Sequence, residues 1–105
     1  MGTSYQFKCP SCGYSAQSSG QLDWGLMDTV EPYICSKCQQ LTDVLVGEHG
    51  NVRPKESLSE KEKRKYYVCG ECRSRKITKW DTEKRPCPKC GSSMVKDEHS
   101  LQDWD

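Results

Sequence analysis

Eight cysteines, arranged as four Cys-x-x-Cys pairs, constrain the fold of this chain more than any other feature. The pairs are Cys9/Cys12, Cys35/Cys38, Cys69/Cys72 and Cys87/Cys90, and no cysteine is left over. A loop of 22 residues separates the first two pairs, and a loop of 14 residues separates the last two. Paired Cys-x-x-Cys motifs at such separations are typical of zinc sites, in which four thiolates surround the metal as a tetrahedron.

The composition explains why a cross-link of this kind is needed. Only 33% of the 105 residues are hydrophobic, and a single Phe is among them. Ordering a chain of this length costs on the order of 100–200 kcal/mol of conformational entropy, which a core this small offsets poorly. Bound zinc stabilises small domains by roughly 10–16 kcal/mol per ion. We therefore expect two Zn²⁺ ions as structural cofactors.

Several classes of protein are not expected. No apolar run approaches the roughly 18–20 residues of a membrane span. Residues 1–6 lack a basic region followed by an apolar stretch, so they do not resemble a signal peptide. We expect a cytoplasmic, reducing location, where thiols bind metal more often than they form disulfides. Structural disulfides remain the alternative.

Short loops favour pairing of the knuckles in chain order. On this hypothesis the first site consists of Cys9, Cys12, Cys35 and Cys38, and the second of Cys69, Cys72, Cys87 and Cys90. A cross-braced arrangement, first pair with third and second with fourth, would have to thread residues 39–68 between the sites. Closing the shorter loops costs less entropy, so we expect two consecutive sites.

Two of the four knuckles share a distinctive sequence. Cys9-Pro10-Ser11-Cys12-Gly13 and Cys87-Pro88-Lys89-Cys90-Gly91 both have the form Cys-Pro-x-Cys-Gly. Proline fixes φ within the turn, and the glycine can adopt the positive φ that directs backbone amides toward sulfur. These knuckles resemble those of the zinc-ribbon, rubredoxin-like superfamily. The resemblance implies a small metal-bound, mostly β fold of two consecutive four-Cys zinc ribbons. The knuckles at 35–38 and 69–72 lack both the proline and the glycine.

Iron is the nearest alternative metal. The segments 12–14 and 87–91 both resemble pieces of rubredoxin, which would imply an iron electron carrier. They fall in different predicted sites, however, so neither site would contain both pieces. A tetrahedral four-sulfur site does not select zinc over iron by ligand type.

The remaining sequence predicts short antiparallel strands around the knuckles. Expected strands cover residues 5–8, 14–17, 32–34, 41–46, 66–68, 76–80 and 94–96. We expect zinc ribbons at 1–47 and 66–96, a polar linker at 48–65 and a flexible acidic tail at 97–105. Ser59 and Glu62 fit a capping box, which predicts a short helix in the linker. The apolar residues between 22 and 30 predict either a miniature core over the metal or a partner-binding lobe.

The charge distribution points to a macromolecular partner. Residues 61–89 contain eleven basic and four acidic residues. Aromatic side chains interleaved with basic ones suit single-stranded nucleic acid. Each Zn²⁺ with four thiolates has a net charge of −2, which weakens this argument, so a protein partner remains equally open. Candidate contact residues are Tyr66, Tyr67, Arg75, Lys76, Lys79 and Trp80 for nucleic acid and Trp24 for a protein.

A catalytic role is not expected. A catalytic zinc keeps one position open for water, whereas four cysteines close the coordination shell. His49 and His99 fall in the predicted linker and tail, away from the knuckles. The sequence therefore predicts a non-catalytic, zinc-dependent interaction module or scaffold without a small-molecule substrate.

Overall fold

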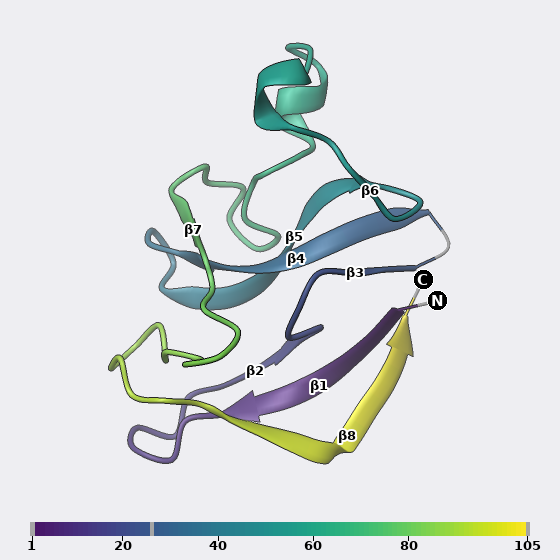
Figure 1. Ribbon diagram of the computed structural model, residues 1–105. Helices are drawn as coiled ribbons and strands as arrows, with labels where there is room; N and C mark the ends of the chain where they lie inside the picture. The colour runs from purple at the N-terminus through teal and green to yellow at the C-terminus, as the bar shows by residue number, and fades with distance from the viewer. Residues whose placement is uncertain (1, 26, 105) are drawn as a thin grey trace.

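The computed structural model describes residues 2–25 and 27–104 and shows two antiparallel sheets stacked on each other (Figure 1). The terminal sheet has β1 in the middle, between β2 and β8. Its strands are β1 (Gly2–Lys8), β2 (Ser15–Ser18) and β8 (Val95–Trp104). The small, mostly β fold predicted from the sequence is confirmed.

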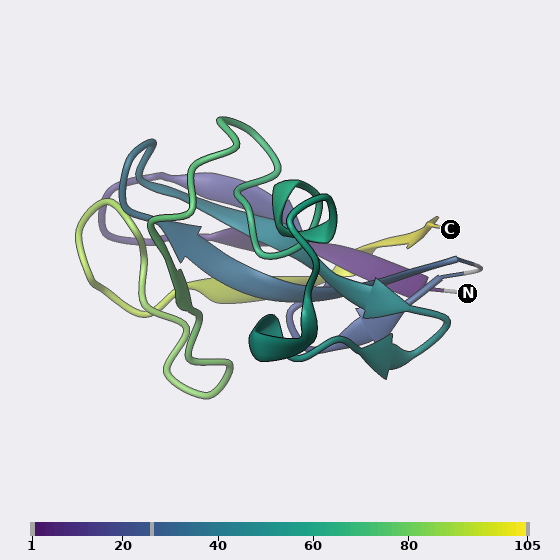
Figure 2. The ribbon, with the colours of Figure 1, turned by 90° about the horizontal axis from the view of Figure 1, so that it is seen from above.

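The central sheet contains the other five strands, in the order β3-β4-β5-β6, with β7 also paired to β4. These are β3 (Asp23–Trp24), β4 (Asp28–Cys35), β5 (Gln40–Glu48), β6 (Asn51–Val52) and β7 (Ile77–Lys79). Two short 3₁₀ helices, η1 (Lys55–Ser57) and η2 (Glu62–Arg64), lie beyond β6. Seen from above, both termini lie at one end of the molecule, and the β1–β2 and β4–β5 turns lie at the other (Figure 2).

Strand β5 has apolar residues on both faces because it is covered on both sides. Val44 and Val46 are fully buried and pack with Tyr33 on the face toward the 3₁₀ helices. Leu41 faces the terminal sheet and belongs to a second core with Phe7, Trp80 and Met94. The central sheet is therefore the middle layer of three. Because both of its faces are covered, a small number of apolar residues can be buried on each side.

Trp80 is the centre of the core between the sheets. Its ring packs edge-on against Phe7, with the ring centroids 5.3 Å apart and an interplanar angle of 83°. Its indole N–H donates to the Pro86 carbonyl at 2.8 Å. Gly20 closes this core from outside, because a Cβ there would lie 2.8 Å from the Phe7 ring.

A half-buried carboxylate joins the two sheets. Asp43 on β5 accepts hydrogen bonds from the Ser18 hydroxyl at 2.7 Å and from the Ser19 backbone N–H at 2.9 Å. Burial raises the pKa of Asp43, and these serine hydrogen bonds lower it in part. The bonds stabilise the buried charge and fix the end of β2 against the central sheet.

The predicted flexible tail is wrong. Residues 97–104 continue β8, which pairs with β1 from Lys8↔Val95 to Gly2↔Trp104. A bulge interrupts this register, and there the Gln6 backbone N–H donates to the Ser100 hydroxyl oxygen at 2.6 Å. One edge of β1 is occupied by β2, and the open backbone groups of its other edge pair with the acidic C-terminal segment. The polar sequence of this segment did not indicate that pairing.

The segment at 48–65 folds back on the central sheet. Strand β6 pairs with β5, and Arg53 forms an ion pair with Glu62 at 2.8 Å. The predicted capping box is present: the Ser59 N–H donates to the Glu62 carboxylate at 3.0 Å, and the Glu62 N–H donates to the Ser59 hydroxyl at 3.2 Å. The helix that follows is one 3₁₀ turn.

Two further predictions of local structure are wrong. Residues 66–68 form bends rather than a strand, with Tyr67 in the left-handed region at φ 58°. The proposed miniature core between 22 and 30 does not form, since Leu22, Trp24 and Met27 are 41%, 50% and 62% exposed. Leu26 lies outside the described residues. Among the helices of the described ranges, none is long and apolar enough to cross a bilayer.

Candidate metal centre

The eight cysteines form two clusters of four, in each of which all the sulfurs lie within 4.8 Å of one another. The outer tetrad joins the first and last knuckles: Cys9, Cys12, Cys87 and Cys90. The inner tetrad joins the middle two: Cys35, Cys38, Cys69 and Cys72. Both tetrads could hold a metal ion.

The predicted pairing of the knuckles is therefore wrong. It is neither sequential nor cross-braced but nested, with one site enclosed by the other along the chain. Each tetrad takes one knuckle from residues 1–47 and one from 66–96, so the predicted domain boundaries do not separate the two clusters.

Strand pairing explains the nested order. The Lys8↔Val95 pair sets the strand that precedes the first knuckle beside the strand that follows the last one. The Cys35↔Ile77 pair sets the second knuckle beside the strand that follows the third. The knuckles meet because the strands that carry them are neighbours in a sheet.

The entropy of loop closure opposes this arrangement only weakly. The nested order closes an inner loop of 30 residues, and an outer path formed by the segments of 22 and 14 residues. Because closure entropy grows with the logarithm of loop length, the nested order costs only about 1 kcal/mol more than the sequential one. A few strand hydrogen bonds and the shared core outweigh that difference.

The sulfur geometry suits a tetrahedral metal. The Sγ atoms of Cys9 and Cys90 lie 3.4 Å apart, and those of Cys35 and Cys72 lie 3.5 Å apart. Tetrahedral coordination with Zn–S bonds of ~2.3 Å places sulfurs ~3.8 Å apart, whereas a disulfide bond is about 2.05 Å long. All eight cysteines are free thiols in the structure.

All four knuckles have the same backbone turn. The residue after the second cysteine has a positive φ in each case: 81° at Gly13, 52° at Gln39, 65° at Arg73 and 83° at Gly91. In three knuckles its N–H donates to the carbonyl of the first cysteine, at 2.9–3.0 Å. The inner knuckles therefore have the same backbone conformation as the outer ones, although Gln39 and Arg73 occupy the position of the glycine.

Backbone amides point at sulfur in both tetrads. The Glu71 N–H donates to Cys69 Sγ at 3.4 Å, and the Lys89 N–H donates to Cys87 Sγ at 3.3 Å. Such bonds stabilise thiolate over thiol.

The pKa values of two cysteines in the outer tetrad are shifted in opposite directions. Hydrogen bonds from the Ser92 backbone and hydroxyl lower the pKa of Cys90 to about 6. A backbone hydrogen bond from Tyr14 lowers the pKa of Cys12, but loss of solvation and the neighbouring sulfurs raise it to about 12 overall. Four adjacent thiolates repel one another, so a divalent cation is needed to ionise all four.

The inner tetrad behaves in the same way. Burial acts to raise the pKa of Cys35, but hydrogen bonds from the Cys38 backbone and the Cys72 side chain lower it to about 7. Burial raises the pKa of Cys38 to about 12, with the adjacent sulfurs adding to the shift.

The tetrads differ in exposure. In the outer tetrad Cys12 and Cys90 are exposed. In the inner tetrad Cys35 and Cys69 are completely buried, and the other two cysteines are half-buried. The outer tetrad thus contains two exposed cysteines, whereas none of the four inner cysteines is fully exposed.

The candidate partner residues separate into three groups. Tyr66, Tyr67 and Arg75 line one groove, although only 2% of the Tyr66 surface is exposed. Trp80 is buried in the core and cannot contact a partner. The others are exposed: Lys76, Lys79, whose ammonium lies 3.3 Å from the Glu31 carboxylate, and Trp24 on β3.

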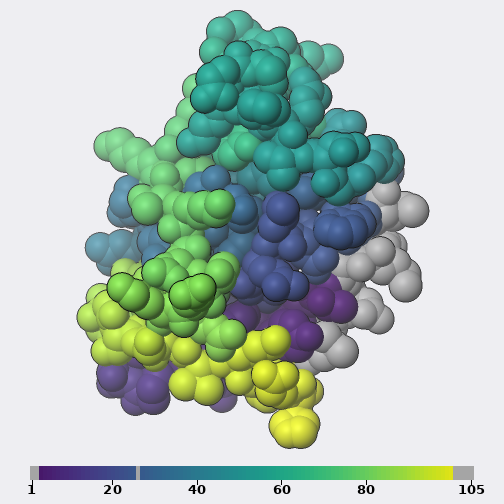
Figure 3. All heavy atoms as spheres, viewed as in Figure 1, coloured from purple at the N-terminus to yellow at the C-terminus, as the bar shows by residue number. Residues whose placement is uncertain are grey.

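The groove has further walls that the sequence analysis missed. Lys55, Leu58 and Lys63 complete it, and its volume is about 310 Å³. We call this the basic groove. It lies in the lobe formed by residues 53–76, part of which rises above the sheets in the space-filling view (Figure 3). The Ser59–Glu62 capping box was the available signal, because it turns this segment back over Tyr66 and Tyr67.

No known protein family, curated protein or solved structure matches this chain significantly. The function must therefore be argued from the two tetrads and the surfaces that they organise.

Proposed function

We propose that this chain is a non-catalytic module that binds single-stranded nucleic acid, held in shape by one Zn²⁺ in each tetrad. The observation that supports the partner is the basic groove, where three cations line a surface that also contains the half-buried ring of Tyr67. The proposal has two parts, the metal and the partner, which are tested separately.

The zinc assignment is supported by the donor set. Four sulfurs form a closed shell that leaves no position for a reactive water, as in structural zinc sites. The tetrads join strands from distant parts of the chain, so a bound metal would stabilise the fold and have a structural rather than a catalytic role.

The nucleic-acid assignment is supported by the charge of the lobe. Residues 53–76 contain nine basic and four acidic residues, a net charge of +5. A Zn²⁺ with four thiolates in the adjacent inner tetrad contributes −2. The lobe thus remains positive when the site is filled, which suits a phosphate backbone.

The groove also offers an aromatic platform. Tyr67 is half-buried, with its ring perpendicular to that of Tyr33 and its hydroxyl donating to the Arg53 carbonyl at 2.8 Å. The Lys55 ammonium lies 5.1 Å from the centre of the Tyr67 ring. A flexible lysine over a fixed ring can move aside for a base and then contact its phosphate.

Fluorescence anisotropy with labelled single strands of RNA and DNA, eight nucleotides long, tests this proposal. We expect binding that weakens steeply between 50 and 200 mM salt, with a log–log slope of roughly −0.7 per phosphate contact. Lys63→Gln and Arg75→Gln should each reduce the magnitude of the slope by the amount expected for about one phosphate contact.

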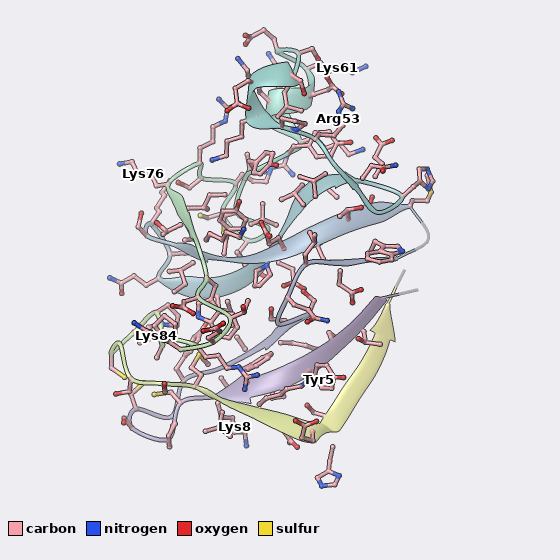
Figure 4. All side chains as sticks on the ribbon, in the orientation of Figure 1. Tyr5, Lys8, Arg53, Lys61, Lys76 and Lys84 are labelled. Atoms are coloured by element: carbon pink, nitrogen blue, oxygen red, sulfur yellow. The ribbon has the colours of Figure 1, made fainter. Side chains whose placement is uncertain are left out.

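Lys8→Gln is the matched control, because it removes the same charge from β1, at the opposite end of the molecule from Lys61 and Arg53 (Figure 4). If Lys8→Gln and Lys63→Gln weakened oligonucleotide binding equally, the effect would come from net charge alone. That result would contradict binding in the basic groove. Salt-tolerant capture of a protein, lost on mutation of Trp24, would instead identify a protein scaffold.

A second candidate function, iron-based electron transfer, is favoured by one observation. The nested pairing brings the knuckles that contain the two rubredoxin-like segments, 12–14 and 87–91, into the same tetrad. The visible spectrum tests it directly: native protein with iron in the outer tetrad is red and bleaches on reduction, whereas a protein with two zinc ions is colourless.

A further inference from the structure

A small polar pocket lies between the terminal sheet and the hairpin that carries the last knuckle. Its volume is about 180 Å³, and its walls include Gln21, Thr82, Arg85 and Lys96. It is separate from the basic groove, since Tyr5, which also lines it, lies at the opposite end of the molecule from Arg53 and Lys61 (Figure 4). We call it the anion pocket.

The pocket holds two half-buried cations, Arg85 and Lys96. Among the side chains that the structure describes, those of residues 3–25 and 27–100, no carboxylate lies within ion-pair distance of either cation. The Lys96 ammonium lies 3.7 Å from the centre of the Tyr5 ring, and the Arg85 guanidinium lies 5.6 Å from that of Phe7. The rings displace water from both cations but do not neutralise them.

The fold fixes both cations in place. Lys96 is opposite Phe7 in the β1–β8 register, which sets it on the same face of the sheet as Tyr5. Arg85 Nε donates to the Thr82 carbonyl at 3.4 Å, which leaves the two terminal nitrogens of the guanidinium without an acceptor among the described residues. Among the described residues, the Thr82 hydroxyl and the Gln21 amide likewise have no hydrogen-bond acceptor.

We infer that this pocket binds the phosphate group of a phosphomonoester, or free phosphate, through Arg85 and Lys96. Two cations match a group with about −1.5 to −2 charges at neutral pH better than a single carboxylate. Arginine forms bidentate hydrogen bonds to phosphate oxygens, and lysine adds a point charge. The volume is below the ~300–1,000 Å³ of pockets that enclose whole drug-sized ligands, which indicates recognition of a headgroup.

NMR titration of the metal-loaded full chain with sodium phosphate tests the inference, with sodium chloride at equal ionic strength as reference. Saturable shifts are expected at the amides of Gly20, Thr82 and Lys96. Lys96→Gln and Arg85→Gln should each weaken binding by at least about tenfold. The strand position of Lys96 makes its variant safe for folding, should Arg85→Gln fail to fold.

Two controls separate the pocket from general charge. Lys84→Gln removes an exposed cation next to Arg85 that does not line the pocket, and Lys63→Gln removes one from the basic groove. Both should bind phosphate like the unmodified chain. Failure of Lys63→Gln to bind oligonucleotide bears only on the proposed function.

Non-saturating shifts, equal shifts with chloride, or unchanged binding in Lys96→Gln would overturn the inference. A parallel titration with glycerol 3-phosphate distinguishes the source of the group. Tighter binding of the ester supports a phosphorylated molecule, and tighter binding of inorganic phosphate supports the free ion.

Discussion

The outer and inner tetrads have the same geometry but different sequences and surroundings. The outer knuckles carry proline and glycine, and Cys12 and Cys90 are exposed. The inner knuckles have neither residue at those positions, and Cys35 and Cys69 are fully buried. The outer tetrad combines favourable turn sequences with two exposed cysteines, although Cys9 and Cys87 pack in the core between the sheets. In the inner tetrad, where the turn sequences are less favourable, burial by the central sheet helps to hold the turns in place.

The largest expected effect is loss of the inner tetrad. Cys69→Ser removes a completely buried ligand from the site that joins β4 to β7. Zinc binding contributes roughly 10–16 kcal/mol, as much as the 5–15 kcal/mol by which whole domains are stable. We expect the central sheet to unfold, with loss of at least one metal equivalent by elemental analysis.

Cys90→Ser is the matched variant in the outer tetrad. It should lose one metal equivalent while the amides of knuckles 35–38 and 69–72 keep their dispersed NMR shifts. The pairing itself is tested by the same spectra: if Cys90→Ser perturbs knuckle 69–72 and leaves knuckle 9–12 unchanged, the nested arrangement is incorrect.

The next effect concerns the rate of metal release. Because Cys12 and Cys90 are exposed, a chelator can reach the outer site directly, whereas the half-buried Cys38 and Cys72 restrict its access to the inner site until the structure opens locally. We expect two kinetic phases with a colorimetric chelator, and the amides around the outer tetrad should change in the fast one. A single phase, or earlier change around the inner tetrad, would contradict the difference in protection.

Sequence alone identified the eight cysteines of the two clusters but not which knuckles pair with each other. The i, i+3 spacing and the turn residues are local signals, so all eight sulfurs and the knuckle at Gly13 could be read directly. The pairing depends on contacts between segments as distant as β1 and β8, and it differs from the alternative by only about 1 kcal/mol of loop entropy. No local pattern reports a difference of that kind.

The same limit explains the fate of the aromatic residues. Trp80 lies in a basic stretch, which suggested a partner surface, but Phe7 packs on it from the other end of the chain. Arg85 is one of the eleven basic residues between 61 and 89, and nothing in the sequence places it in one pocket with Lys96.

A smaller effect is expected from replacing glycine in an outer knuckle. Gly13 has φ 81°, and a Cβ there would have no heavy atom within 4 Å, so Gly13→Ala tests conformation without a clash. Left-handed backbone costs an L-residue ~1–2 kcal/mol, partly offset by a less flexible unfolded chain. We expect zinc affinity at the outer tetrad to fall about fivefold in a chelator competition, which corresponds to about 1 kcal/mol. An unchanged affinity would show that the glycine is not needed for the turn.

The smallest effect is the reverse change in an inner knuckle. Gln39 occupies the equivalent position at φ 52° and is exposed, so Gln39→Gly relieves the left-handed strain without removing a buried contact. The added flexibility of the unfolded chain offsets part of the gain, which leaves about 0.5 kcal/mol in favour of the folded protein. Zinc affinity at the inner tetrad should therefore rise about twofold, with no change at the outer one. A decrease would mean that the central sheet already holds Gln39 without strain, and that sequence and burial do not substitute for each other at these two sites.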